Sequence, residues 1–99
     1  MVGSSPWPIA ITIRLSRDAD VEAARQLTLS VAAEIAGESA VVGCFLTKID
    51  PVSITLELRF KAADAGGRDV LRSKMLTTLP RRFAEAKIGS SGTDLPSFA

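Results

Sequence analysis

The sequence predicts an α+β fold in which two helices cover one face of an antiparallel sheet. Two observations support this prediction: a strict alternation of apolar and polar residues over positions 52–60, and the order strand, helix, strand, strand, helix along the chain. A period of two places one set of side chains on a buried face and the other set nearer to solvent. The element order is that of a ferredoxin-like sandwich, which combines two split β-α-β halves. A short last strand is optional in this prediction.

The first part of the chain predicts a strand followed by a helix. Pro6-Trp7-Pro8 restricts the backbone to extended conformations, and the residues from Ile9 to Ser16 alternate as a strand does. Asp18 to Asp20 offers N-caps for a helix that Gly37 ends. The apolar stripe of this helix consists of Val21, Ala24, Leu27, Thr28, Val31, Ala32 and Ile35.

The middle of the chain predicts a hairpin. Ser39 to Ile49 is a nearly continuous apolar run, which is expected to form the second strand. Asp50-Pro51 is a turn signal, and the short spacing to Val52 implies a hairpin with the third strand. The apolar residues expected on the buried face of the third strand are Val52, Ile54, Leu56, Leu58 and Phe60.

A loop over residues 62–67 and a second helix are expected next. Pro80 lies within this helix on its polar side, so we expect a kink there, or alternatively a break into two helices. The buried side is predicted to carry Leu71, Met75, Leu76, Leu79, Phe83 and Ala86. The folded domain is thus predicted at residues 9–88, with a flexible leader at 1–8 and a tail or short edge strand at 89–99.

The two helical regions carry opposite charge balances. Residues 18–36 contain four acidic residues and one basic residue, whereas residues 68–87 contain six basic and two acidic residues. Helices that lie side by side on one sheet face would attract weakly, because an exposed ion pair contributes only about 0–1 kcal/mol. Most of the stability is expected from the apolar faces, at ~25 cal/mol per Å² buried.

Composition limits the possible classes of function. A chain of 99 residues with a net charge of +1 is one domain without a long-range field that would attract nucleic acid or anionic lipid. Its longest apolar run, at residues 41–46, is far shorter than the ~20 residues of a membrane helix. The single cysteine, Cys44, cannot form an internal disulfide, which favours a reducing cytosolic setting.

The chain offers little for catalysis or metal binding. It contains no histidine, the commonest general base and metal ligand. Cys44 lies in an apolar strand and is expected to be a buried structural thiol. Asp18, Asp20 and Glu22 suit helix capping better than a cation site, and Gly66-Gly67 lacks the rest of a phosphate-binding loop. We therefore predict no catalytic, cofactor-binding or metal-binding residue, and no cofactor.

Nucleic-acid binding by such a sandwich would need aromatic side chains on the exposed sheet face to stack bases. The residues expected to point outward from the third strand are instead Ser53, Thr55, Glu57, Arg59 and Lys61. The basic residues of the second helix are expected to form a solvated face: Arg68, Arg72, Lys74, Arg81 and Arg82. No nucleic-acid partner is predicted.

Three apolar residues fall outside the predicted core and are candidate subunit contacts. Leu29 lies off the apolar stripe of the first helix, and Trp7 and Phe98 lie near the two ends of the chain. The alternative is that Leu29 is a tolerated exposed leucine and that the two aromatic residues pack on the body of the domain.

The segments at residues 53–60 and 69–76 resemble the C-terminal cytoplasmic domain of small-conductance mechanosensitive channels. That family shows a serine-led strand that ends in Leu-x-Leu-Arg-aromatic, as in Leu56 to Phe60, followed by an Arg-Ser helix start, as in Arg72-Ser73. The run from Phe83 to Ile88 also matches, and the similarity spans most of residues 9–88. Two positions depart from the family: Glu38 to Ala40 stands where prolines are usual, and Gly89 to Thr93 interrupts the approach to the last strand.

The resemblance implies a non-catalytic module of a channel subunit that helps to build a cytoplasmic cage and modulates gating or solute passage. Its implied partners are other subunits and the rest of the channel chain, on the cytoplasmic side of the cell (inner) membrane and without direct membrane contact by this domain. The present chain would then be a fragment of a longer protein. The residues alone leave two alternatives open: a free-standing regulatory module that binds a small ligand or dimerises through sheet edges, and an enzyme that uses carboxylate or lysine chemistry. The missing histidine and tyrosine disfavour the enzyme.

Overall fold

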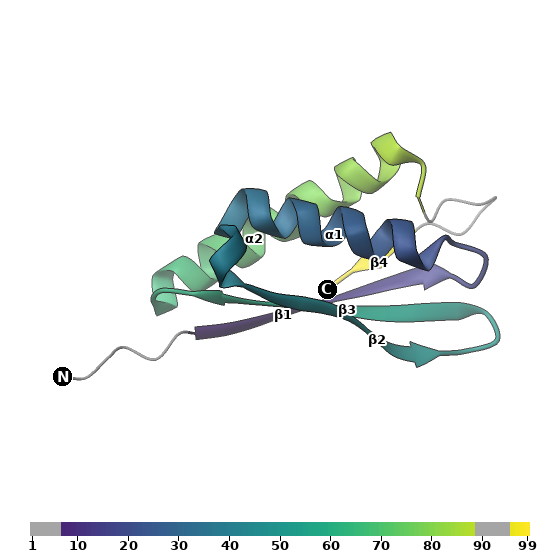
Figure 1. The fold of residues 1–99 in the computed structure, drawn as a ribbon, viewed down its shortest axis with the longest axis horizontal. Coiled ribbons are helices and arrows are strands. Elements are labelled where there is room, and N and C mark those ends of the chain that lie inside the picture. Colours follow the sequence, from purple (N-terminus) through teal and green to yellow (C-terminus); the bar gives the residue numbers. More distant parts are fainter. Residues whose placement is uncertain (1–6, 89–95) are drawn as a thin grey trace.

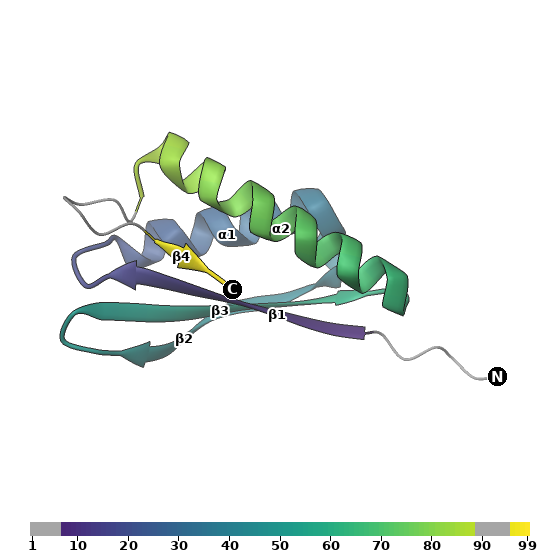
Figure 2. The same ribbon diagram turned by 180° about the vertical axis from the view of Figure 1, so that it is seen from behind.

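The computed structural model describes residues 7–88 and 96–99, and these residues form the predicted α+β sandwich. The elements are β1 (Trp7–Ser16), α1 (Val21–Ala36), a short 3-10 helix η1 (Glu38–Ala40), β2 (Val41–Ile49), β3 (Ser53–Ala62), α2 (Ala65–Ala86) and β4 (Ser97–Phe98). The strands form one antiparallel sheet in the order β2-β3-β1-β4. Figures 1 and 2 show both helices on the same face of this sheet, as the ferredoxin-like prediction requires.

The centre of the sheet is the β1–β3 pair, which keeps its register from Trp7 opposite Ala62 to Ser16 opposite Ser53. Every second residue of each strand faces the helices and is at most 6% exposed. These residues are Ile9, Ile11, Ile13, Leu15, Ile54, Leu56, Leu58, Phe60 and Ala62. The alternation therefore predicted the buried residues of β1 and those of β3 from Ile54 to Phe60, whereas Ala62, which was expected in a loop, is the last residue of β3.

The beginning of the third strand was predicted wrongly. Val52 lies in the turn before β3 and is 73% exposed, whereas Ser53, expected to face outward, is buried. The turn explains the shift, because the Asp50 N–H donates to the carbonyl oxygen of Ser53 at 2.8 Å and so closes the hairpin one residue later. The Ser53 hydroxyl lies near the Arg14 guanidinium and the Asp50 carboxylate, which supply its polar partners.

Helix α1 begins and ends where its capping residues predict. The Asp20 carboxylate accepts a hydrogen bond from the Ala23 N–H at 3.0 Å, and the Gly37 N–H donates to the carbonyl oxygen of Ala33 at 2.9 Å. The stripe that was predicted to be apolar faces the sheet, with Ala24, Thr28, Val31 and Ala32 fully buried. The buried hydroxyl of Thr28 donates to the carbonyl oxygen of Ala24 at 2.8 Å, so it costs little to bury.

Helix α2 begins earlier than predicted. The Asp64 carboxylate accepts a hydrogen bond from the Gly67 N–H at 2.6 Å, and this cap draws residues 65–67, which were expected to form a loop, into the first turn. The helix continues through Pro80, which is exposed as expected, so the alternative break into two helices is wrong. Met75, Leu79 and Phe83 are buried as predicted.

The last turn of α2 differs from the prediction. Ala86 was expected on the buried side of the helix but is exposed. Figures 1 and 2 show the reason: α2 rises away from the sheet toward its C-terminal end. The Arg82 guanidinium forms two hydrogen bonds with the Glu34 carboxylate of α1, at 3.1 and 3.2 Å, which lower the pKa of Glu34. The predicted attraction between the helices is thus present at this exposed pair.

The ends of the domain differ from the predicted boundaries. β1 begins at Trp7, two residues before the predicted start at Ile9, and the rest of the predicted leader lies outside the described residues. The optional last strand exists, because Phe98 pairs with Ile13 of β1 and Ser97 pairs with Arg14. In residues 7–88 and 96–99, no helix combines the length and the apolar character that crossing a bilayer requires.

Candidate functional site

The edge strand β2 exposes an unusual amount of apolar surface. Seven large hydrophobic residues are exposed in the described part of the chain, and four of them lie on this strand. They are Val42, Phe45, Leu46 and Ile49, with exposed fractions of 52%, 40%, 48% and 55%, and Val52 lies in the adjoining turn. We call these five residues the β2 apolar edge. Such clustered exposure is typical of an interaction surface.

The apolar residues occupy both faces of β2. Leu46 lies opposite Leu56 and Ile49 lies opposite Ile54, so both belong to the face that carries the helices. Phe45 lies opposite Glu57, on the outer face of the sheet. A nearly continuous apolar sequence is typical of a strand that is covered on both faces. Within the described chain, however, β2 has a strand neighbour on one side only, and Cys44 is its only buried residue.

The backbone of β2 is protected against simple strand addition. Its register with β3 shifts between Val41 and Gly43 and again between Leu46 and Lys48. Bulges and edge lysines are devices that prevent one sheet from extending into another. We therefore expect a partner to contact the side chains of the β2 apolar edge more than its backbone.

Phe45 is held at the surface by its neighbours. Its ring lies over Gly43, where an added Cβ would come within 2.8 Å of the ring, so the absence of a side chain at Gly43 makes this position possible. The Arg59 guanidinium lies over the same ring, 4.8 Å from its centroid, and also pairs with the Glu57 carboxylate. The aromatic ring is thus fixed at the outer face of the sheet, available to a partner.

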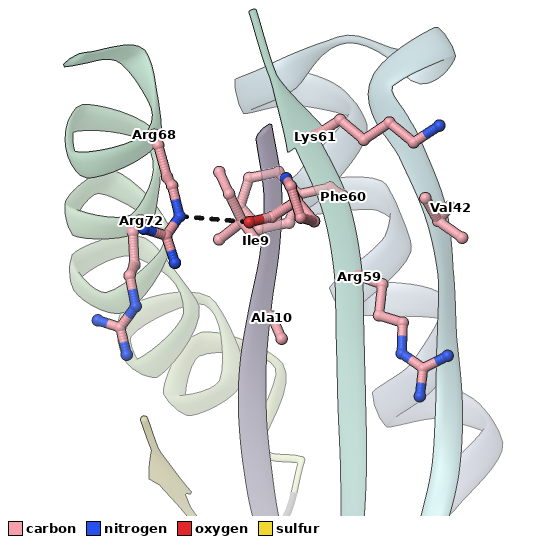
Figure 3. Close-up of a pocket in the computed structure, with 9 residues that line it drawn as sticks. Ile9, Ala10, Val42, Arg59, Phe60, Lys61, Arg68 and Arg72 are labelled. Carbon is pink, nitrogen blue, oxygen red and sulfur yellow. Dashed lines mark hydrogen bonds between the residues drawn. The ribbon is translucent and has the colours of Figure 1, made fainter. Parts of the chain in front are cut away.

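A hollow of about 550 Å³ adjoins this edge (Figure 3). We call it the cationic hollow, because four positively charged residues and no acidic residue line it. Its lining consists of Pro8, Ile9, Ala10, Val42, Arg59, Phe60, Lys61, Arg68 and Arg72. Val42 belongs both to this lining and to the β2 apolar edge.

Two arginines of the hollow bind main-chain oxygens. The Nε of Arg68 donates to the carbonyl oxygen of Pro8 at 3.3 Å, and a terminal nitrogen of Arg72 donates to the main-chain oxygen of Ala99 at 2.7 Å. Sequence reasoning expected Arg68 and Arg72 on a solvated face and did not associate them with Arg59 and Lys61. No local pattern could have done so, because α2 and β3 approach one another only in the folded domain.

The three predicted contact residues lie on three separate elements. Trp7 is 44% exposed at the start of β1, whereas Leu29 on α1 is half-buried and packs against the core. Phe98 of β4 is also half-buried, and its ring meets that of Phe83 edge-on at a centroid distance of 5.2 Å. The structure does not bring these residues together into one surface, and their role as subunit contacts stays a prediction.

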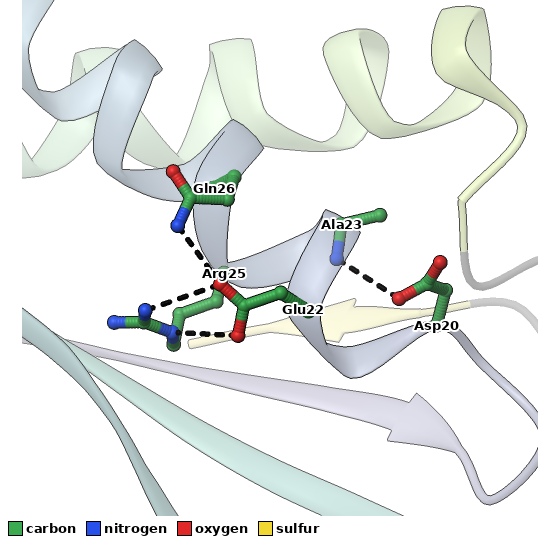
Figure 4. A network of polar contacts seen from close by, with 5 residues as sticks. All are labelled: Asp20, Glu22, Ala23, Arg25 and Gln26. Atoms are coloured by element: carbon green, nitrogen blue, oxygen red, sulfur yellow. Dashed lines mark hydrogen bonds and ion pairs between the residues drawn. The ribbon is translucent and has the colours of Figure 1, made fainter.

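Two of the acidic residues near the start of α1, Asp20 and Glu22, have hydrogen-bond partners (Figure 4). Asp20 caps the helix, and Glu22 accepts hydrogen bonds from Gln26 at 2.9 Å and Arg25 at 3.2 Å, both of which lower its pKa. Across residues 7–88 and 96–99, no three acidic, cysteine or histidine side chains are grouped so that they could hold a metal ion.

Cys44 is buried among the core residues, with 3% of its surface exposed. Burial raises the pKa of its thiol to about 11, although the nearby Arg25 acts in the opposite direction. Since the thiolate is the reactive form, the thiol is expected to be inert at neutral pH. The prediction of a buried structural cysteine is confirmed.

We expect Cys44 to react with Ellman's reagent at pH 8 far more slowly in the folded protein than in urea. A matched control is Thr47→Cys in a Cys44→Ala background, which places a thiol at an exposed position of the same strand and should react quickly.

The folded protein retains a thiol proton that the unfolded chain loses near pH 9, so the free energy of unfolding should fall between about pH 9 and pH 11. The Cys44→Ala variant has no thiol at this position, so its free energy of unfolding should not show this decrease. Rapid labelling of folded wild-type protein would contradict the assignment.

Comparisons with known proteins give a distant likeness to a solved structure. No family model matches the chain, and no curated protein matches it. Among solved structures, the chain is similar to the crystal structure of a protein of unknown function from Nitrosomonas europaea, with 26% sequence identity and a TM-score of 0.42. The match covers 95% of this chain and 85% of the Nitrosomonas protein. This similarity gives no function to carry over, and the site geometry alone supports the proposals below.

Proposed function

We propose that this domain is an assembly module that contacts neighbouring copies of the same chain through the β2 apolar edge. The observation that carries the proposal is the exposure of Val42, Phe45, Leu46 and Ile49 on a single edge strand. Burial of such side chains is the main favourable term in protein association, at ~25 cal/mol per Å² removed from water.

A second copy is a suitable partner because charged residues beside Phe45 and Ile49 form ion pairs within one copy. Lys48 pairs with Asp50, and Arg59 pairs with Glu57, so each copy presents two positive and two negative groups. When such surfaces meet, like charges need not face each other, and opposite charges can be exchanged across the contact.

The resemblance to mechanosensitive channels favours a particular assembly. In that case the domain is the cytoplasmic module of a channel subunit, and the β2 apolar edge is a lateral contact in a cage that modulates gating or solute passage. The alternative is a free-standing regulatory module that dimerises through the same edge. Both proposals use the same surface and describe a non-catalytic protein.

A triple variant tests the assembly. Val42→Thr, Leu46→Thr and Ile49→Thr together reduce the apolar surface of the edge but keep residues that favour a strand. We expect the molecular mass from light scattering to rise with concentration for the wild-type chain and to stay monomeric for the variant. The control is Val70→Thr, an equally exposed valine on α2, which should associate as the wild type does. A wild-type chain that is monomeric at millimolar concentration would contradict the proposal.

A cellular experiment separates the channel from the free-standing module. Cells that lack the complete gene should survive osmotic downshock less well if the chain belongs to a channel, and the gene with the triple substitution should restore survival poorly. Full survival of the deletion strain would remove the channel proposal and leave the assembly module. Apolar helical spans encoded upstream of this domain would favour the channel.

A further inference from the structure

We propose that the cationic hollow binds a small phosphorylated molecule, with its phosphate groups held by Lys61, Arg68 and Arg72. This inference rests on other residues than the assembly through the β2 apolar edge, apart from Val42, which both surfaces share. A volume of about 550 Å³ lies within the range of sites that take small ligands and cofactors.

The cations of the hollow come from two elements. Arg68 and Arg72 are four residues apart on α2, so they share one face of the helix, and Arg59 and Lys61 share the outward face of β3. Figure 3 shows the first pair on one side of β1, and on the other side the side chains of Arg59 and Lys61 extend from β3 toward β2. The Lys61 side chain would have to turn toward β1 for one ligand to contact it together with Arg68 and Arg72.

Part of the positive charge of the hollow has no acidic side chain as its partner. In the described part of the chain, the ion pairs within 4.0 Å involve Arg25, Lys48, Arg59 and Arg82, and none involves Lys61, Arg68 or Arg72. The whole chain has a net charge of only +1, so this concentration of cations does not reflect a generally basic protein. Like charges one helical turn apart destabilise a helix slightly, and a bound anion would remove that repulsion.

The hydrogen bonds of the two arginines support a binding role. The carbonyl oxygen of Pro8 orients the guanidinium group of Arg68 without neutralising it, and the main-chain oxygen of Ala99 binds Arg72. A guanidinium has five N–H donors, so each arginine keeps donors for phosphate oxygens. Arg59 is the exception, because Glu57 already pairs with it.

The rest of the lining favours a small ligand over a nucleic acid strand. Pro8, Ala10 and Val42 provide apolar surface for the body of a ligand. The outward residues of the central strands beside the hollow are Pro8, Ala10, Arg59 and Lys61, none of which is aromatic. Phe45 of β2 is exposed on the same outer face, but one ring is not a platform for successive bases.

Inorganic pyrophosphate is the probe for this site. At constant ionic strength set with sodium chloride, we expect pyrophosphate to raise the melting temperature and to bind saturably in calorimetry. The double variant Lys61→Gln and Arg68→Gln should weaken binding by at least about tenfold, because charge-assisted hydrogen bonds are lost. The matched control is Lys74→Gln with Arg81→Gln, which removes the same charge from exposed positions of α2 outside the hollow and should bind as the wild type does. Equal weakening in both double variants, or no saturable binding by the wild type, would overturn the proposal.

Two further arms identify the source of the phosphate. Vesicles of phosphatidylcholine with and without phosphatidylglycerol test lipid headgroups, and a single-stranded oligonucleotide tests nucleic acid. If pyrophosphate does not bind, then cosedimentation with the anionic vesicles or tighter binding of longer oligonucleotides would overturn the assignment to a small molecule. If pyrophosphate binds, and neither the vesicles nor the oligonucleotides do, the assignment to a small molecule is supported.

Discussion

Phe83→Ala is expected to lower the free energy of unfolding by about 3–5 kcal/mol, the usual cost of truncating a buried phenylalanine. Phe83 is fully buried on α2, where its ring meets Phe98 of β4 edge-on. Its removal would leave a cavity in the core and would also take away the surface on which Phe98 rests. Since domains of this size are stable by only about 5–15 kcal/mol, the variant should unfold at much lower urea concentration, as circular dichroism can measure.

Phe98→Ala is the control for this prediction. Phe98 is half-buried, so its truncation should cost the aromatic contact of about 0.5–1.5 kcal/mol and part of its buried area, and the total should be clearly smaller. The double variant should lose less free energy of unfolding than the two single variants lose together, because both single changes remove the same ring contact. Equal losses for the two single variants would mean that β4 is a central part of the core.

Gly37→Ala is expected to destabilise the domain by about 1–3 kcal/mol for a reason that involves no steric clash with neighbours. Gly37 ends α1 with a φ of 93° and a ψ of 145°, a backbone conformation that residues with a Cβ rarely adopt. An added Cβ would meet nothing within 4 Å, so the whole cost would be conformational. Urea denaturation of the variant measures it.

Gly66→Ala provides a comparison of opposite sign. Gly66 lies in the first turn of α2, and a Cβ there would meet only the Asp64 carboxylate at an ordinary 3.6 Å. Alanine restricts the unfolded chain and suits a helix, so this variant should be more stable than the wild type by about 0.4–1 kcal/mol. The same change in sequence thus has opposite expected effects at the two positions. If Gly37→Ala were also stabilising, the strain at the end of α1 would be disproved.

The sequence predicted those parts of the fold that a local period or a capping residue determines. Alternation placed the residues of β1 and β3 on their faces, and Asp20 and Gly37 marked the ends of α1. The misplaced boundaries depend on single hydrogen bonds, such as the Asp64 cap that starts α2 early. Periodicity cannot reveal such bonds, because several nearby residues could form them.

The candidate surfaces could not be predicted from the sequence for a different reason. The apolar run of β2 indicates a strand, but nothing in that run says that the strand lies at the edge of the sheet. In the same way, the cationic hollow combines residues 8–10 and 59–61 with Val42, Arg68 and Arg72, which come together only through packing. The order of the strands decides both surfaces, and that order depends on contacts distant in the chain.

The two borders of the sheet are unequal, and this difference limits how copies can join. The β1 border is partly closed, because β4 pairs with Ile13 and Arg14 and the Arg68 side chain binds the carbonyl oxygen of Pro8. Of the two borders, only the β2 border carries a wide exposed apolar strip. A copy that has docked through this strip therefore has no second strip on its opposite border to bind another copy. Growth should therefore stop at a finite particle instead of running on into fibres.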